Sequence, residues 1–239
     1  MLFHVLGPIE VHATGAHLAV PGKPAVVLTT LLLHRNAWVS LDELAEQVWP
    51  HGRAPLSAVA NLRTYVWRVR RLLPEPGRLD RLGDTYRLRA QPDEVDAGRA
   101  ARVLAEASRT ADPAQALSMV DEALGWWRGR AYPGLDTPLA LTLAEQLDEL
   151  RLDLRELRAA RLLALGRGAE ATAELRVVLT AAPLRERAWA GLMHTLSATG
   201  RRSEALMAYR RAAELLAAEL DVPPGPELLA ARRLVLAPA

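Results

Sequence analysis

The 239-residue sequence predicts a mainly α-helical protein in two parts: an α+β module over residues 1–90 and an all-α domain over residues 91–239. Within the first part, short β-prone runs flank three helical segments, whereas helical periodicity alone follows residue 92. In the second part, seven positions recur 34 residues apart, which is the period of a tetratricopeptide helix pair. The β-prone runs are residues 3–6, 9–11, 79–82 and 85–89.

The element order of residues 1–90, with three helices followed by a hairpin, is that of a winged helix-turn-helix. Ser40 and Glu43 have the spacing of a capping box at the start of the second helix. Ser57 is a favourable N-cap residue for the third helix, and Gly83-Asp84 is a suitable hairpin turn. We therefore predict helices at residues 24–35, 41–48 and 57–73.

Residues 91–239 are predicted to form a tetratricopeptide-like domain of seven helices. The repeat places Gly166 and Gly200 at equivalent helix ends, where glycine takes the left-handed cap conformation. It also aligns two small residues, Ala171 and Ala205, which let paired helices approach closely. The predicted helices are residues 95–108, 113–127, 138–165, 169–181, 185–198, 203–220 and 226–236.

Composition excludes several classes of protein. Because there is no cysteine, disulfides, thiolate metal sites and cysteine nucleophiles are absent. The longest apolar run, residues 25–33, is far shorter than the ~20 residues of a membrane span, and the first residues do not resemble a signal peptide. We therefore expect a cytoplasmic protein without a membrane partner.

No motif typical of an enzyme or a cofactor site occurs in the sequence. A phosphate-binding Gly-rich loop and a Gly-x-Ser-x-Gly elbow are both missing. The six histidines lack the His-x-x-x-His spacing of a helical metal site. We expect no catalytic residues, no cofactor and no metal.

Charge is unevenly distributed: residues 1–90 carry a net +4 and residues 91–239 a net −2. The third predicted helix contains four arginines and no acidic residue, so it forms no i,i+4 ion pair. DNA phosphates would neutralise these charges, and an α-helix fits the major groove. The alternative is a solvated basic face.

The candidate DNA-binding residues follow from the two faces of this helix. Leu62, Val66 and Val69 fall on one predicted core face. The opposite half should reach base edges near its N-terminus and phosphates further on. Arginines of the hairpin can enter the minor groove, or they are ordinary strand surface charge. The candidates are Asn61, Arg63, Thr64, Trp67, Arg68, Arg70, Arg71, Arg81 and Arg87.

Trp67 has two interpretations, because it points away from the core face of the helix. It either contacts the DNA backbone and sugars, flanked by Thr64 and Arg68 on the same face, or packs under the hairpin or against a second protomer.

The chain resembles the SARP group of AfsR-related bacterial transcriptional activators over almost its whole length. The resemblance begins with Leu6-Gly7-Pro8-Ile9-Glu10-Val11 and continues in order through the sequence. Two departures are Gly83-Asp84-Thr85-Tyr86, where the family has Gly-x-Gly-Tyr, and Trp67, where a small residue is common. The matching fragments are residues 6–11, 39–45, 48–49, 68–72, 86–88, 94–96, 184–189, 200–206, 208–210 and 224–228.

This resemblance implies an OmpR-type winged helix over residues 1–90 and a bacterial transcriptional activation domain over residues 91–239. It implies an activator of a secondary-metabolite, often antibiotic, gene cluster that binds direct repeats in double-stranded DNA, an arrangement compatible with a homodimer. It also implies recruitment of RNA polymerase through its sigma or alpha subunit, with residues 49–55 as the contact in the winged domain. The alternative is a helical-repeat protein-interaction scaffold with a degenerate winged-helix domain.

Overall fold

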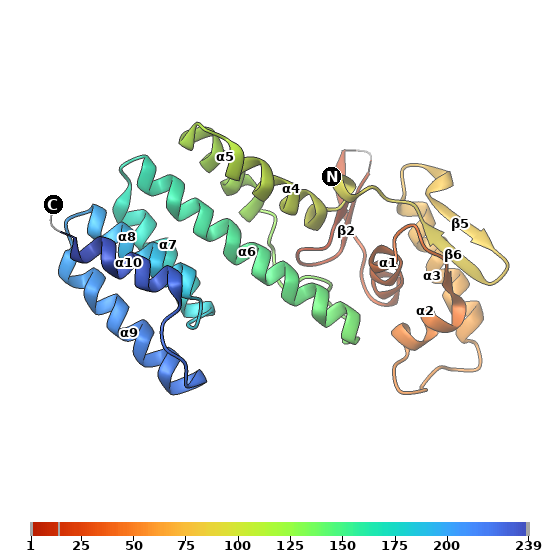
Figure 1. The fold of residues 1–239 in the computed structure, drawn as a ribbon. Helices are drawn as coiled ribbons and strands as arrows, with labels where there is room; N and C mark the ends of the chain where they lie inside the picture. Colours follow the sequence, from red (N-terminus) through yellow and green to blue (C-terminus); the bar gives the residue numbers. More distant parts are fainter. Residues whose placement is uncertain (1, 14, 238–239) are drawn as a thin grey trace. The chain divides into compact units, whose positions relative to one another are not determined.

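The computed structural model describes residues 2–13 and 15–237. The chain divides into two compact units (Figure 1). The first unit comprises Met1–Arg102 and Gly125–Glu149, and the second comprises Val103–Leu124 and Leu150–Ala239. The first unit therefore extends beyond residue 90, where the sequence places the boundary between its two modules.

The first unit contains the predicted winged helix-turn-helix. Its two sheets are antiparallel, with strand orders β1-β2-β3 and β4-β6-β5. The sequence does not predict β4, because a two-residue strand is too short to show alternation. The elements are β1 (Phe3–His4), β2 (Glu10–Ala13), β3 (Ala16–Ala19), α1 (Lys23–Leu33), β4 (Val39–Ser40), α2 (Leu41–Val48), α3 (Ala58–Leu72), η1 (Pro76–Arg78), β5 (Leu79–Leu82), β6 (Thr85–Leu88) and η2 (Pro92–Glu94).

Local sequence signals explain how α2 and α3 begin. The predicted capping box is present: the Glu43 backbone N–H donates to Ser40 Oγ at 3.1 Å, and the Ser40 N–H donates to Glu43 Oε2 at 2.7 Å. These hydrogen bonds lower the pKa of Glu43. Ser57 differs from the prediction, because its side chain does not cap the backbone of α3. Its hydroxyl instead accepts a hydrogen bond from Asn61 Nδ2 at 3.1 Å.

The N-terminal sheet is joined to segments that come much later in the chain. The buried carboxylate of Asp96 accepts hydrogen bonds from the backbone N–H groups of Val5 (2.9 Å) and Leu6 (3.2 Å). The Arg128 backbone N–H donates to Leu6 O at 2.7 Å. Gly7 has a φ of +143°, and a Cβ there would lie 2.8 Å from Arg128 Cβ, so only glycine fits. These contacts explain why residues 91–102 and 125–149 belong to the first unit.

The seven helices predicted after residue 92 are all present. Only the second ends clearly earlier than predicted, because α5 stops at Leu124, before Gly125. The prediction extends to residue 127 because the apolar pattern continues to Trp127, which is buried outside the helix. None of the helices in residues 2–13 and 15–237 is long and apolar enough to cross a membrane. The helices are α4 (Asp96–Arg109), α5 (Pro113–Leu124), α6 (Pro138–Ala164), α7 (Gly168–Ala181), α8 (Glu186–Ala198), α9 (Arg202–Leu220) and α10 (Pro226–Leu236).

The 34-residue repeat is visible in the geometry of the second unit. Gly166 and Gly200 have φ values of +75° and +77°, as the left-handed cap requires. After each glycine an arginine pairs with the glutamate three residues later, with equal N···O distances of 2.7 Å. The aligned alanines, Ala171 and Ala205, are fully buried. The ion pairs are Arg167–Glu170 and Arg201–Glu204.

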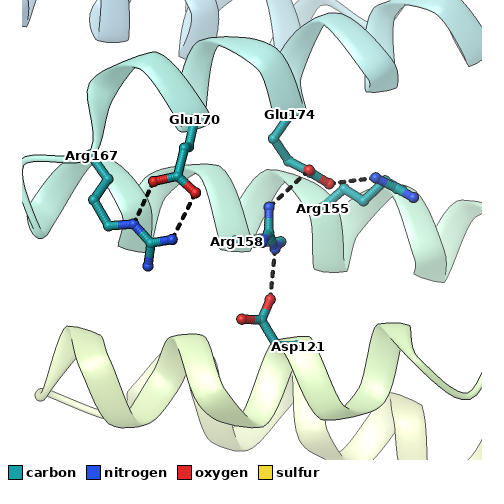
Figure 2. A network of polar contacts seen from close by, with 6 residues as sticks. All are labelled: Asp121, Arg155, Arg158, Arg167, Glu170 and Glu174. Atoms are coloured by element: carbon teal, nitrogen blue, oxygen red, sulfur yellow. Dashed lines mark hydrogen bonds and ion pairs between the residues drawn. The ribbon is translucent and has the colours of Figure 1, made fainter.

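A polar network joins three helices within the second unit (Figure 2). Glu174 of α7 accepts hydrogen bonds from Arg155 at 2.6 Å and Arg158 at 3.0 Å, both on α6. Arg158 also donates to Asp121 of α5 at 2.7 Å. Glu174 is buried, and its hydrogen bonds link α7 to α6, whereas the exposed Arg167–Glu170 pair is local to the start of α7.

Candidate nucleic-acid interface

Helix α3 packs in the first unit by the face that its sequence predicts. Leu62, Val66 and Val69 are at most 1% exposed, and α3 contacts both α1 and α2. The hairpin β5–β6 is attached to the same helix, because Arg70 Nη2 donates to Leu79 O at 2.9 Å. The hairpin is therefore linked to the C-terminal half of α3.

The opposite face of α3 is open to solvent. Thr64, Arg68 and Arg71 are exposed, and Asn61 is partly exposed. Trp67 is 52% exposed, and the Arg71 guanidinium lies over its ring at 4.9 Å. This face therefore presents cationic, aromatic and hydroxyl groups together, which are the groups that contact DNA backbones and bases.

The arginines of the interface differ in whether they already form an ion pair within the protein. Arg68 has no ion-pair partner among the described residues. Arg63 Nη2 lies 3.1 Å from Asp84 Oδ1, but both side chains are about half exposed or more. Such a surface pair contributes little, so Arg63 can exchange Asp84 for a phosphate.

Arg81 is also exposed, and it lies near the turn of the hairpin. Its Nε donates to Gly83 O at 2.9 Å, and its Nη2 lies 3.9 Å from Asp84. Asp84 therefore lies beside two predicted DNA-binding arginines. No sequence signal points to this arrangement, because Asp84 stands at the variable position of the Gly-x-Gly-Tyr pattern and is 21 positions from Arg63 in the chain.

Two predicted contact residues have roles inside the protein. Arg70 is only partly exposed and bonds to β5. Arg87 donates to Asp80 at 2.8 and 3.1 Å and lies over the Trp38 ring at 4.5 Å. The hydrogen bonds from Arg87, joined by one from Arg89, hold the pKa of Asp80 below its usual value. Contact of Arg70 and Arg87 with DNA remains a prediction.

The loop between α2 and α3 is the most exposed segment next to this interface. Residues 50–57 are all exposed. Leu56 extends completely into solvent, although it is apolar. At the base of the loop, Trp49 is buried, with Lys23 Nζ 4.6 Å from its ring centroid. The loop therefore projects from a fixed base.

The second unit has a groove of about 820 Å³ on helices α7, α8 and α9. Its walls combine apolar and charged groups, among them Trp189, Met207 and Arg211. The Met207 side chain is 64% exposed. A mixed, open groove of this size is suited to a peptide or protein partner.

Three histidines, which lack a metal-binding spacing in the sequence, lie close together on the N-terminal sheet. They are His4, His12 and His17, one on each strand. Burial, together with the charges of His17 and Arg128, lowers the pKa of His4 to about 4. The hairpin register, which sequence spacing does not reveal, brings these residues together.

Comparison with known proteins agrees with this architecture. The family described as the bacterial transcriptional activator domain matches residues 93–236. The regulatory protein AfsR of Streptomyces griseus is 35% identical over 98% of this chain and 24% of its own length. The regulatory protein DnrI of Streptomyces peucetius is 29% identical over 95% of this chain and 89% of its own length.

A solved structure is similar over nearly the whole chain. Mycobacterium tuberculosis EmbR in complex with a low affinity phosphopeptide superposes with a TM-score of 0.82 and 30% identity, covering 98% of this chain and 64% of EmbR. The chain therefore belongs to the SARP family of regulators that contain a bacterial transcriptional activator domain. It spans about a quarter of the length of the AfsR relatives.

Proposed function

We propose that this protein is a sequence-specific DNA-binding transcriptional activator of a secondary-metabolite, such as antibiotic, biosynthetic gene cluster, and that α3 is its recognition helix. The observation that carries the proposal is the outer face of α3. Thr64, Trp67 and Arg68 are exposed on a helix that contains no acidic residue. The relatives of this chain include proteins described as regulatory proteins or as transcriptional regulators.

The geometry supports a division of roles along α3. In the major groove, residues near the start of a recognition helix reach base edges, so we assign base contacts to Asn61 and Thr64. Arg68 and Arg71 lie further along the helix, where they meet phosphates, and Arg63 joins them by leaving Asp84. Arg81 is assigned to the backbone or the minor groove beside the hairpin.

We extend the proposal to the promoter complex. Protomers bind adjacent direct repeats in double-stranded DNA, where they meet as a homodimer, and recruit RNA polymerase through its sigma or alpha subunit. The loop at residues 49–55, which is exposed from residue 50 onward, is the proposed polymerase contact, because it lies next to α3 in the chain without belonging to the face that we assign to DNA.

The test is a binding titration of the full chain with promoter fragments from its own gene neighbourhood, at two or more salt concentrations. Specific affinity should fall as salt rises, with a log–log slope of about −0.9 for each neutralised phosphate. Arg68→Ala should weaken specific binding at least tenfold and make the slope shallower by about 0.9. Its fold should be unchanged, because the side chain is exposed.

Arg211→Ala is the matched control, since Arg211 is an exposed arginine in the second unit. Its specific affinity should equal that of the wild type. Operator affinity at the wild-type level in folded Arg68→Ala would reject the assignment of α3.

A second candidate function is a protein-interaction scaffold whose winged domain does not bind DNA. The groove on α7, α8 and α9 favours it. In this case no promoter fragment would bind better than unrelated DNA of equal length, and Met207→Glu would abolish capture of the partner protein. Specific, salt-dependent binding by the wild type would exclude this function.

A further inference from the structure

Four potential metal ligands share one face of the N-terminal sheet. His4 is on β1, His12 on β2 and His17 on β3. The register pairs His12 with His17 and His4 with Glu10. Side chains two residues apart point to the same face of a strand, so Glu10 and His12 share a face of β2. Their paired residues, His4 and His17, therefore lie on that face too.

The side chains themselves are in mutual contact. The ring centroids are 4.7 Å apart for His4 and His17, and 4.5 Å apart for His12 and His17. One potential ligand nitrogen from each of the three lies within 4.8 Å of the other two. Glu10 Oε2 lies 3.6 Å from His17 Nδ1.

The surroundings of His4 are those of a metal-binding imidazole. Its Nδ1 lies 3.8 Å from Asp96 Oδ2, and Asp96 is fixed by the backbone N–H groups of Val5 and Leu6. Its Nε2 is buried and has no hydrogen-bond partner among the described residues. A histidine that binds a metal through one ring nitrogen usually has a carboxylate or carbonyl near the other.

We propose that His4, His12 and His17 bind one divalent transition-metal ion of the Zn²⁺ class, with Glu10 as the fourth ligand. Three imidazoles and one carboxylate are a suitable tetrahedral donor set for Zn²⁺. Zn–N distances of about 2.0–2.1 Å place ligand nitrogens about 3.3 Å apart. The separations between the ligand nitrogens, now up to 4.8 Å, therefore shorten by up to about 1.5 Å on binding. The exposed His17 side chain can move to allow this.

The charge around the site is compatible with a cation. Arg128 is the nearby positive group, and its Nη1 lies 2.7 Å from Glu10 Oε1. Glu10 Oε2, which faces His17, remains available to the metal. The carboxylates of Glu10 and Asp96 offset two of the three positive charges that Arg128 and the ion carry.

A metal with four protein ligands is structural rather than catalytic, because no coordination position remains for a substrate. Each strand of the sheet supplies at least one ligand, so the ion would hold β1, β2 and β3 together. This sheet also contacts the segment near Arg128. The bound ion would therefore stabilise the first unit as a whole.

The experiment uses the 239-residue chain without a histidine tag, after treatment with a chelator and dialysis. Zn²⁺ titration by calorimetry should give one ion per chain. Co²⁺ should give the visible absorption of a four-coordinate ion, and Zn²⁺ should raise the melting temperature. His12→Gln and His17→Gln should each weaken Zn²⁺ binding by about tenfold to hundredfold or more and remove the thermal shift.

The matched controls are His34→Gln and His194→Gln, which alter exposed histidines outside the cluster and should bind Zn²⁺ like the wild type. Circular dichroism checks that all variants are folded. Wild-type affinity in both His12→Gln and His17→Gln, or equal loss in the control variants, would overturn the proposal. Unchanged affinity in Glu10→Gln would overturn the assignment of the fourth ligand.

Discussion

At the scale of single residues, Trp67 is the most unusual side chain on the surface of α3. Its ring is half exposed, and Arg71 stacks on it from within the same helix. A partner that covers the exposed indole would gain about 25 cal/mol for each Å² of apolar surface removed from water. The stacked arginine also places a positive charge beside the ring. Together they form a surface that can contact a sugar and a phosphate at once.

We therefore expect Trp67 to report DNA binding in fluorescence. The signal that Trp67→Phe removes should be quenched or shifted when operator DNA is added to the wild type. The protein has six tryptophans, so the difference between wild type and variant is the relevant measurement. A difference signal that depends on protein concentration, but is unchanged by saturating DNA, would place Trp67 against a second protomer instead.

At the scale of secondary-structure elements, the glutamates of α7 form ion pairs of unequal burial. Glu174 is buried and bonds two arginines of α6, whereas Glu170 is exposed and bonds one nearby arginine (Figure 2). The two glutamates lie on the same helix and differ by one turn. They are therefore a matched pair for measuring how burial changes the contribution of a salt bridge.

Glu174→Ala should lower the free energy of unfolding by about 2 kcal/mol, because it leaves two partly buried guanidinium groups without their shared acceptor. Glu170→Ala should change stability little, since water replaces its exposed partner. Urea unfolding followed by circular dichroism measures both. Equal effects of the two substitutions would show that burial of Glu174 does not determine its contribution.

The same elements show what could be predicted from the sequence. Helix starts and ends depend on local signals, such as the Ser40–Glu43 capping box and the glycines that end α6 and α8, and these predictions are confirmed. The Arg63–Asp84 and Arg70–Leu79 contacts depend on how the hairpin folds back on α3. The histidine cluster depends on strand register, which short strands with irregular composition do not specify.

At the scale of the whole molecule, the boundary between modules in the sequence differs from the boundary between compact units. Asp96 and Arg128 both lie beyond residue 90, yet they bond to the backbone of the N-terminal sheet. A fragment of residues 1–90 would leave the buried N–H groups of Val5 and Leu6, directly after β1, without their acceptor Asp96, at about 1–3 kcal/mol each. Point substitutions in the full chain therefore separate DNA binding from activation better than truncation does.

An activator must hold DNA with one surface and RNA polymerase with another, so the two activities should be separable by substitution. In the loop between α2 and α3, Arg53 and Leu56 are exposed. Arginine is enriched among the residues that dominate binding at protein interfaces, and a partner that covers the Leu56 side chain would bury its apolar area. Neither residue supports the core, so replacing both leaves the fold intact.

We expect the double variant Arg53→Ala, Leu56→Ser to bind operator DNA within about twofold of the wild type, because the face of α3 is unchanged. Activation of a reporter promoter should fall at least fivefold at equal protein level, since the proposed polymerase contact is lost. Met207→Ser provides the comparison in the groove of the second unit and should leave activation intact if the loop is the contact. Loss of activation by Met207→Ser, with full activation by the loop variant, would assign the polymerase contact to the helical repeat.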